Sequence, residues 1–377
     1  MAKRRIHFLI PLGGLIALAA LIGLLGTPKL IQYAFLPSNE LSVYIDNMEP
    51  FRQALADAAE ITALHGVKAD VSLSVEGGAN ASGVTLYMVG ERWNEAYPRP
   101  MAAGEPLSPA ALKGRSRSIV LDEQLAFKLF GDGEPIGRAV TLSGQAFQVV
   151  GVAKHARRVG ETGPYAAWIP LGSDETSGCD LMVVSAVSGI DGGLMTLFEG
   201  EARDFFGPGT LYGLMKERMR AGMILRFIAL ALALRLLALW IDVLKRVGGA
   251  WIAEYRARMK EAYFSKVLGF ALSRCLAMLL AAAATLAACW ALMNFFVEPV
   301  KVFVEWVPEV LVSFNSIRGR FWELTGAAAA PVTYVTAEMA ELRFWAFLLR
   351  WGVIAALIGA LLDRLVLIFP KENRAKQ

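Results

Sequence analysis

Four long apolar segments constrain this chain more than any other feature. They cover roughly Phe8–Gly26, Met223–Leu244, Val267–Phe296 and Phe344–Phe369. A helix of about 20 residues crosses the roughly 30 Å of hydrocarbon in a bilayer, and each segment is about that long. The mean hydropathy of +0.45, with 55% hydrophobic residues, is high for a soluble domain. The sequence therefore predicts a helical membrane protein with four transmembrane helices.

The first segment also resembles a secretory signal, because a basic stretch at Lys3–Arg5 precedes the apolar run. The run is longer than the apolar part of a typical signal, and the sequence after Gly26 has no pair of small residues at the spacing that signal peptidase needs. We therefore expect an uncleaved membrane anchor.

The distribution of Lys and Arg predicts the orientation of the chain, since cytoplasmic loops of membrane proteins keep an excess of positive charge. Basic residues collect before the first segment, between the second and third segments, and after the fourth. The stretch from 298 to 342 has few of them. We expect both termini in the cytoplasm, and residues of about 36–221 and 298–342 outside. The net charge of +4 follows from this topology and gives no reason to expect a nucleic-acid partner.

The expected organisation has one water-exposed domain between the first and second spans. It would comprise a first transmembrane helix, an extracytoplasmic domain, a second transmembrane helix with a cytoplasmic loop, and two further transmembrane helices joined by an outer loop and followed by a short tail. The corresponding residues are 1–36, 37–221, 222–266 and 267–377. A stretch of about 185 residues is long enough to bury a core of its own.

Hydrophobic periodicity predicts the first elements of this outer domain. Alternating apolar residues indicate a strand at Leu41–Ile45, and apolar residues at helical spacing indicate a helix from Met48 to about His65. Two more strands are expected at Ala69–Val75 and Gly83–Val89, separated by a glycine-rich turn.

A second group of elements follows between residues 117 and 154. The apolar run Ile119–Leu121 leads into an amphipathic helix at Asp122–Phe130, and strands follow at Ala139–Leu142 and Phe147–Ala153. The residues Leu142 to Gln145 between the strands indicate a β-turn. The pattern predicts an α+β domain with a layer of helices on a mixed sheet.

Three short motifs in this region carry a family resemblance. They are Leu129-Phe130-Gly131 at the end of the helix, Pro135-Ile136-Gly137 in the turn, and Val149-Val150-Gly151-Val152 in the last strand. The sequence here resembles the MacB-like periplasmic core domain of MacB/FtsX-type ABC-transporter permeases, over about residues 67–172. The resemblance implies structural roles for the motif residues, namely Leu129, Phe130, Gly131, Pro135, Gly137, Val149 and Gly151.

The resemblance also implies a location, partners and a mechanism. Such permeases lie in the bacterial inner membrane, pair with a second copy or a related subunit, and act with a separate cytoplasmic ATPase. They work by mechanotransmission, in which ATPase closure moves the membrane helices and so the outer domain. Here the first two spans would form the moving stalk.

The sequence contains no motif that indicates catalysis by the chain itself. A phosphate-binding G-x-x-x-x-G-K-[ST] loop is missing, so ATP hydrolysis is expected in another subunit. The three histidines, His7, His65 and His155, are scattered and are expected at a surface or an interface rather than as ligands. We expect no metal, no cofactor and no enzymatic activity.

The cytoplasmic loop Lys245–Lys266 is the expected contact with an ATPase. Within it Ala250–Tyr263 reads as an amphipathic helix, with Trp251, Tyr255 and Met259 along one stripe. The family's own sequence pattern in this loop and in the tail is not recognisable. A basic helix lying on anionic membrane lipid therefore remains the alternative. The candidate coupling residues are Trp251, Glu254, Tyr255, Arg256, Arg258 and Lys260.

Charges inside the apolar segments must find a partner or water. Arg235 and Asp363 lie at similar expected depths in the second and fourth spans, which predicts an ion pair between them. The alternatives are a local partner for Arg235 in Asp242, a snorkelling Arg364 at the inner interface, and an ion or proton pathway.

The sequence leaves two questions open, namely the structure of the outer loop and the function of the whole chain. The apolar stretch Val300–Phe314 of the outer loop predicts either a helix on the membrane surface or a plain surface loop. For the whole chain, the main alternative to a transporter subunit is an ATPase-independent membrane sensor or scaffold that binds a partner through its outer domain. A membrane-bound enzyme is a third class, which the absence of a catalytic motif disfavours.

Overall fold

The computed structural model describes most of the chain and divides it into two compact units. The described residues are 2–38, 40–56, 58–59, 61–76, 78–155, 159, 163–174, 178–187, 192–261, 264–302 and 335–368. One unit comprises residues 1–221 together with 323–377, and the other comprises residues 222–322.

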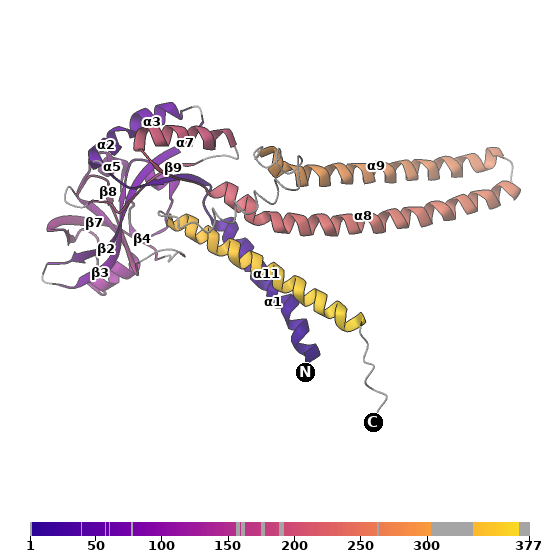
Figure 1. Ribbon diagram of the computed structural model, residues 1–377, viewed down its shortest axis with the longest axis horizontal. Helices are drawn as coiled ribbons and strands as arrows, with labels where there is room; N and C mark the ends of the chain where they lie inside the picture. Colours follow the sequence, from indigo (N-terminus) through magenta and orange to yellow (C-terminus); the bar gives the residue numbers. More distant parts are fainter. Residues whose placement is uncertain are drawn as a thin grey trace, which may run out of the picture. The chain divides into compact units, whose positions relative to one another are not determined.

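The first unit contains a mixed sheet, visible in Figure 1. Its strands are β1 Leu30–Phe35, β2 Ile61–Ser74, β3 Asn80–Val89, β4 Met101–Gly104, β5 Ser118–Asp122, β6 Ala139–Leu142, β7 Gln145–Ala153, β8 Tyr165–Pro170, β9 Leu181–Val187 and β10 Gly209–Gly213. Their order is β10-β1-β9-β2-β3-β8-β5-β7-β4, with β6 paired to both β2 and β7. β3 pairs with β8, and β5 with β7, in parallel. The expected α+β domain with a mixed sheet is confirmed.

Pairing by β6 closes part of this sheet on itself. The far end of β2 pairs with β6 through Leu73 and Leu142, and β6 pairs along its length with β7. The strands β2, β3, β8, β5, β7 and β6 therefore form a closed ring of pairings. The ring pairs the strands within it on both sides, whereas β10 and β4 each pair with one strand, β1 and β7.

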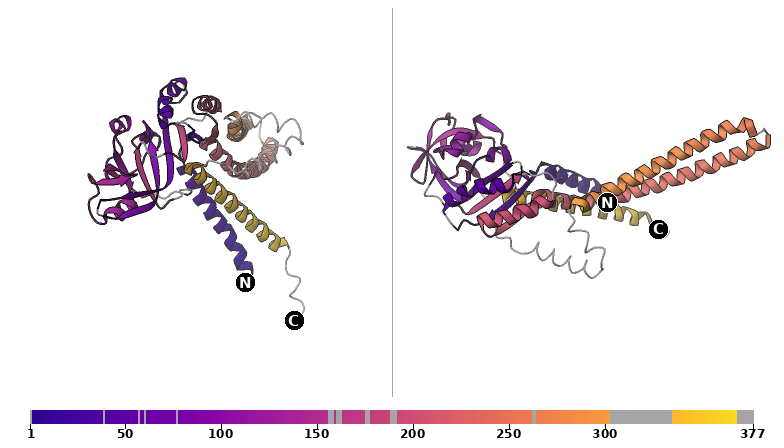
Figure 2. Two further views of the ribbon diagram at one scale, coloured as in Figure 1. Left: turned by 60° about the vertical axis from the view of Figure 1, so that its left-hand side comes forward. Right: turned by 90° about the horizontal axis from the view of Figure 1, so that it is seen from above.

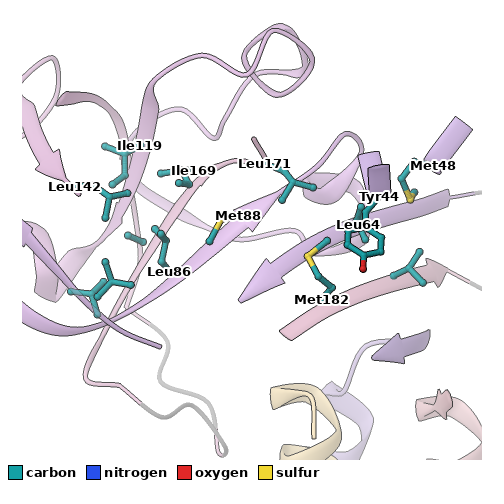
Figure 3. Close-up of a cluster of buried hydrophobic side chains, with 14 of the residues drawn as sticks. Tyr44, Met48, Leu64, Leu86, Met88, Ile119, Leu142, Ile169, Leu171 and Met182 are labelled. Carbon is teal, nitrogen blue, oxygen red and sulfur yellow. The ribbon is translucent and has the colours of Figure 1, made fainter. Parts of the chain in front are cut away.

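Apolar side chains pack on both faces of the sheet. The larger cluster, part of which is shown in Figure 3, lies between the sheet and one set of helices. Those helices are α2 Leu41–Asp46, α3 Met48–Ala54, α6 Glu123–Phe130 and α7 Gly192–Phe206. The smaller cluster is built around Trp93, Tyr97 and Trp168 and includes residues of α4 Trp93–Ala96 and α5 Pro109–Lys113. The functional features described below lie with this smaller cluster.

The predictions for the first part of the outer domain were partly wrong. Residues 41–46 form the helix α2 rather than a strand, and only Tyr44 of that helix is buried. The helix expected from Met48 to His65 ends at Ala54, and the chain is already in β2 from Ile61. The reason is tertiary, because β2 pairs antiparallel with β9 from Ile61 to Val67. The apolar spacing alone could not distinguish that pairing from a longer helix.

The sheet also begins earlier than expected, since β1 starts at Leu30 while the outer domain was expected from residue 37. The second group of predictions agrees with the structure. The helix expected at 122–130 is α6, and the expected strands are β6 and β7. The β-turn at Leu142–Gln145 is present, with positive φ at Ser143 and Gly144, which is the conformation of a two-residue hairpin turn.

Four helices of the described part are long and apolar enough to cross a membrane. They are α1 Ala2–Gly26, α8 Leu214–Glu261, α9 Phe264–Val302 and α11 Ala337–Ile368. α1 and α11 lie side by side in Figures 1 and 2. A Cβ added to Gly13 would lie 2.6 Å from the backbone of Gly352 and Ala356, so the two helices approach backbone to backbone.

The second unit is a helical hairpin of α8 and α9. The indole of Trp240 donates a hydrogen bond to the Thr285 hydroxyl over 3.1 Å, and Arg226 donates one to the carbonyl of Phe295 over 3.0 Å. α8 has 48 residues and so is about 72 Å long, more than twice the thickness of the hydrocarbon. The expected second span and the expected amphipathic helix at 250–263 therefore belong to one helix, at least up to Glu261.

Most of the expected outer loop between α9 and α11 lies outside the described residues. α9 continues to Val302, so the first residues of the predicted surface element at 300–314 are helical. The choice between a membrane-surface helix and a plain loop for the remainder stays a prediction.

Candidate functional site

The candidate site contains two buried polar residues that lie in otherwise apolar strands. In β1 the residues Ile31, Tyr33 and Phe35 face the larger cluster, so period-two alternation turns Gln32 to the opposite face. Gln32 pairs in register with Ser185 of β9. Both residues are fully buried. Buried polar side chains need hydrogen-bond partners, and these two find theirs on the face of the smaller cluster.

Gln32 joins the sheet to the beginning of α11. Its side-chain nitrogen donates to the Glu338 carboxylate over 3.1 Å and to the Tyr97 hydroxyl over 2.8 Å. Its side-chain oxygen accepts a hydrogen bond from the Thr336 hydroxyl over 2.7 Å. Ser185 contacts the same Tyr97 hydroxyl at 2.6 Å. We call Gln32, Tyr97, Ser185, Thr336 and Glu338 the joint.

Thr336 also positions the helix that follows it. Its hydroxyl accepts a hydrogen bond from the backbone N–H of Met339, in the first turn of α11. A threonine in this position satisfies one of the free donors at a helix N-terminus. One side chain therefore both starts α11 and fastens it to β1. Since the network is buried, each lost bond leaves a costly unsatisfied group.

His65 lies beside the joint and corrects one expectation. The histidine was expected at a surface or interface, but it is 5% exposed and packs edge-on against Tyr97, with the ring centroids 5.3 Å apart. Burial lowers the pKa of His65 from 6.5 to about 4, because the charged imidazolium would lose its hydration. His65 is therefore neutral near pH 7, and it is buried because β2 passes beneath α4.

A cavity of about 170 Å³ lies on the same face of the sheet as the joint. Trp93 of α4 and Trp168 of β8 line it together with Arg99. The Arg99 guanidinium lies 4.4 Å from the ring centroid of Trp168 and 5.7 Å from that of Trp93. We call this space the aromatic cavity. It is close to the joint, because the Trp93 ring stacks on Tyr97 with the centroids 5.4 Å apart.

A smaller space next to the aromatic cavity contains an acid–histidine pair. The His155 Nδ1 atom lies 2.7 Å from the Asp122 carboxylate, which is 4% exposed. Burial raises the pKa of Asp122, and its hydrogen bond with His155 acts in the opposite direction. Within the described residues no group of three or more His, Cys, Asp or Glu side chains that could hold a metal is found, so this pair has no third ligand-type side chain there.

The motif residues build a corner of the domain and do not line the aromatic cavity. Gly131 ends α6 with a positive φ of 60°, which a side chain would strain. The N–H of Gly137 donates to the carbonyl of Val149, which ties the turn to β7. A Cβ at Gly151 would lie 2.2 Å from the carbonyl oxygen of Glu105. Leu129 is buried against the core, Phe130 lies under Arg138, and Pro135 precedes the turn.

The candidate coupling residues lie along the last turns of α8. Trp251 and Tyr255 line an open apolar groove of about 700 Å³ between α8 and α9. Arg274 of α9 lies 4.4 Å from the Trp251 ring centroid. The aromatic stripe therefore faces α9, which the sequence could not show. The charged residues lie around it: Glu254 and Arg258 form an ion pair of 2.6 Å, and Arg256 and Lys260 are exposed.

The predicted pair of Arg235 and Asp363 would connect the two compact units, because Arg235 lies in α8 and Asp363 in α11. It stays a prediction. The structure also gives Asp363 an interaction.

Sequence reasoning missed the joint and the aromatic cavity. The available signals were a glutamine inside the apolar strand LIQYAF and a tryptophan, Trp93, six positions before Arg99. Neither signal indicates which distant residues meet, since Gln32 and Glu338 are separated by 306 positions.

These features define a class of protein, namely a membrane protein with an α+β outer domain fastened to its long apolar helices. Residues 9–192 match the family model of the MacB-like periplasmic core domain. The match includes most of α1 and the sheet as far as β9, and extends beyond the resemblance seen at residues 67–172. The chain therefore carries a MacB-like periplasmic core domain, the domain of ABC-transporter-type permeases.

Solved structures of two such domains are similar to this chain. One is the extracellular domain of the noncanonic ABC-type transporter YknZ from Gram-positive bacteria, at 19% identity over 46% of this chain and 92% of that one, with a TM-score of 0.37. The other is the periplasmic region of MacB from Actinobacillus actinomycetemcomitans, at 13% identity over 51% and 92%, with a TM-score of 0.40. Comparison with curated protein sequences gives no match.

Proposed function

We propose that this chain is the membrane subunit of an ABC transporter that works by mechanotransmission with a separate cytoplasmic ATPase. It would span the bacterial inner membrane four times, with both termini in the cytoplasm, and pair with a second copy or a related permease subunit. Its substrate would be handled by the outer domain rather than through a water-filled channel.

The observation that carries this proposal is the attachment of the sheet to the helices at neighbouring strands. β10 ends at Gly213 and α8 begins at Leu214, so no linker separates them. β1 pairs with β10 and carries Gln32, whose hydrogen bonds fasten the start of α11. A displacement of either helix would therefore be transmitted to β1 and β10, because packed and hydrogen-bonded elements move as rigid bodies.

The end of the α8–α9 hairpin is the proposed docking element. Its charged residues give a partner a defined pattern to recognise, and the Glu254–Arg258 pair is exposed enough to be reached, at 41% and 51%. Exposed ion pairs of this spacing add little to helix stability, about 0.3–0.5 kcal/mol. Altering them would thus change recognition far more than folding.

The pair allows a test in which recognition and helix stability are separated. The tagged protein is purified in mild detergent from its native membrane, partners are identified by mass spectrometry, and ATPase activity is measured. We expect an ATPase in fixed stoichiometry with the wild type and its loss with Glu254→Arg or Arg258→Glu. The double variant, Glu254→Arg with Arg258→Glu, restores an ion pair within the helix but inverts the order of the two charges. It should therefore also fail to retain the ATPase.

A matched control comes from α7 of the outer domain. Glu199 and Arg203 form an ion pair with the same spacing, and their double exchange should leave ATPase association unchanged. Recovery of association by the double exchange at Glu254 and Arg258 would mean that helix stability matters rather than docking. If the wild type never retains an ATPase, the coupling proposal fails. Loss of binding to anionic vesicles alone, with the ATPase retained, would assign the basic hairpin end to lipid.

One observation favours the alternative of an ATPase-independent sensor or scaffold. α8 continues to Glu261 and α9 begins at Phe264, so the described residues contain no separate short helix between the two. Such a protein would bind its partner or ligand through the outer domain with no change on addition of ATP. The purification above distinguishes the two functions, because a sensor would keep its outer-domain partner in the absence of any ATPase.

A further inference from the structure

Three sulfur atoms meet above Gly66 of β2, on the face of the sheet that carries the larger cluster. Gly66 pairs in register with Met88 of β3 on one side and with Met182 of β9 on the other. Residues directly opposite each other in antiparallel strands point to the same face, so both methionine side chains flank the glycine. Both belong to the larger cluster and are labelled in Figure 3. Gly66 has no side chain and so leaves room between them.

Cys179 fills that room. A Cβ added to Gly66 would overlap the Cys179 Sγ atom and would lie 3.1 Å from the Met182 Sδ atom. The Cys179 thiol donates to the Met88 Sδ atom over 3.7 Å. The three sulfur atoms therefore come from β3, from β9 and from the residues just before β9. We call Met88, Cys179 and Met182 the sulfur cluster.

The spacing and the chemistry of the sulfur cluster suit a soft metal ion. Metal–sulfur bonds of about 2.3 Å, the length found for zinc, place two sulfur ligands of one ion about 3.8–4.0 Å apart. The 3.7 Å between Cys179 and Met88 is close to that separation. Thiolate and thioether sulfurs are soft ligands, a combination that selects Cu(I). No metal was expected from the sequence, because only the folded sheet brings residue 88 beside residues 179 and 182.

The charge balance favours a monovalent ion. Met88 and Met182 are 1% and 0% exposed, so an ion between them is shielded from water. A Cu(I) ion that replaces the thiol proton of Cys179 is balanced by one thiolate, and the cluster stays neutral. A Zn²⁺ ion would leave one positive charge without compensation, since the carboxylate of the next residue, Asp180, accepts a hydrogen bond from the Ala69 N–H instead. An uncompensated buried charge is costly.

We propose that the sulfur cluster binds one Cu(I) ion, with the Cys179 thiolate and the Met88 and Met182 thioethers as its ligands. Binding releases the thiol proton to solvent, and the ion keeps its oxidation state. The ion enters at Cys179, which is partly exposed, and ties β3 to β9 across β2. This site goes beyond the proposed transport function and does not depend on an ATPase.

The test uses the full chain in lipid nanodiscs, with Cys275 and Cys289 replaced by serine so that Cys179 is the one remaining thiol. Cu(I) affinity is measured without oxygen by competition with the chelator bicinchoninate. We expect one ion per chain, one proton released per ion, and an X-ray absorption spectrum with sulfur neighbours only. Ag(I) should displace Cu(I), and Zn²⁺ should not. Failure of Cu(I) to bind in competition with the chelator, or displacement of Cu(I) by Zn²⁺, would overturn the proposal.

Three substitutions assign the ligands. Loss of a residue that only supports a metal ligand costs about 10–100-fold in affinity, so loss of a ligand should cost at least about tenfold. We expect this for Met88→Leu and Met182→Leu, and a larger loss for Cys179→Ala, which removes the thiolate. Exchange of methionine for leucine conserves volume and is well tolerated in cores. Met101→Leu, against the smaller cluster, is the matched control and should leave the affinity unchanged. Affinity that survives Cys179→Ala would refute the site.

A variant that alters no ligand tests the geometry. Gly66→Ala adds a methyl group where the Cys179 sulfur lies, so the thiol has to move away from the methionines. Cu(I) affinity should fall about tenfold. The matched control is Gly178→Ala, whose Cβ meets nothing within 4 Å and which should bind Cu(I) as the parent chain does. If Gly66→Ala binds Cu(I) as tightly as the parent, the thiol is not held between the methionines and the proposal fails.

Discussion

The joint allows a quantitative prediction for the substitution Gln32→Leu. Leucine has a similar size and suits a strand between apolar neighbours, so the main effect is the loss of three hydrogen bonds. Two of these join neutral groups, Tyr97 and Thr336, and one joins the Glu338 carboxylate. At about 1 kcal/mol for a neutral bond and about 2 kcal/mol for a bond to a charged group, the expected loss is about 4 kcal/mol.

The loss should appear first as detachment of α11 from the sheet. A change of about 4 kcal/mol raises the population of the detached state about a thousandfold. Hydrogen exchange of full-length protein in nanodiscs reports it, because amides in the first turns of α11 should lose protection by up to that factor. The amides of β5 and β7, which lie away from the joint, should keep theirs.

Controls and a graded variant make the reasoning refutable. Gln53→Leu is the matched control, since Gln53 is exposed on α3 and its side chain donates to Glu49 of the same helix. Ser185→Ala removes one of the contacts of Tyr97 and should cost about 1 kcal/mol. If Gln32→Leu leaves the protection of α11 unchanged, the joint does not hold the helix. Uniform loss of protection over the whole sheet would show that Gln32 acts on the sheet instead.

Three further predictions concern other parts of the molecule. Gly13→Ala should weaken the α1–α11 contact by about 1–3 kcal/mol in detergent titrations, because its Cβ would meet backbone at 2.6 Å, whereas Gly14→Ala meets nothing within 4 Å and should be neutral. Since burial lowers the pKa of His65 to about 4 from 6.5, the unfolded chain binds the proton first, so stability should be full above pH 6.5 and fall by about 3 kcal/mol as the pH approaches 4. A His65→Phe variant should lose that pH dependence, and an unchanged pH profile would contradict the assignment. Burial raises the pKa of Cys179 to about 12, so in a protein with Cys275 and Cys289 replaced by serine, maleimide labelling at pH 7 should be slow until urea is added; rapid labelling of the native protein would disprove the burial.

Local patterns predicted part of the fold well. The helix α6, the strands β6 and β7 and the turn between them follow from residues close in sequence, where glycine, proline and alternation act directly on the backbone. The same reasoning failed at residues 41–65. Alternation at Leu41–Ile45 fitted a strand, but these residues lie in the helix α2. From Met48 the apolar spacing fitted a helix as far as His65, but the pairing of β2 with β9, more than 100 positions away, favoured a strand from Ile61.

The hairpin shows a second kind of limit. Composition correctly indicated apolar helices at Met223–Leu244 and Val267–Phe296 and a helical stretch between them. It could not indicate that the stretch at Ala250–Glu261 continues α8 without a break, since the amphipathic pattern of a separate surface helix is the same. It also could not show that Trp251 and Tyr255 face α9.

The sequence by itself determined that this is a membrane protein with a MacB-like outer domain, because apolar length and short glycine-containing motifs are local properties that need no partner. Only the tertiary structure decided which distant residues its polar and aromatic side chains contact. Gln32 acquires a role when Glu338 reaches it, and Trp93 and Trp168 form one wall only after β8 and α4 are packed together. Contacts between distant residues depend on strand order and helix docking. Local sequence patterns do not specify either of these.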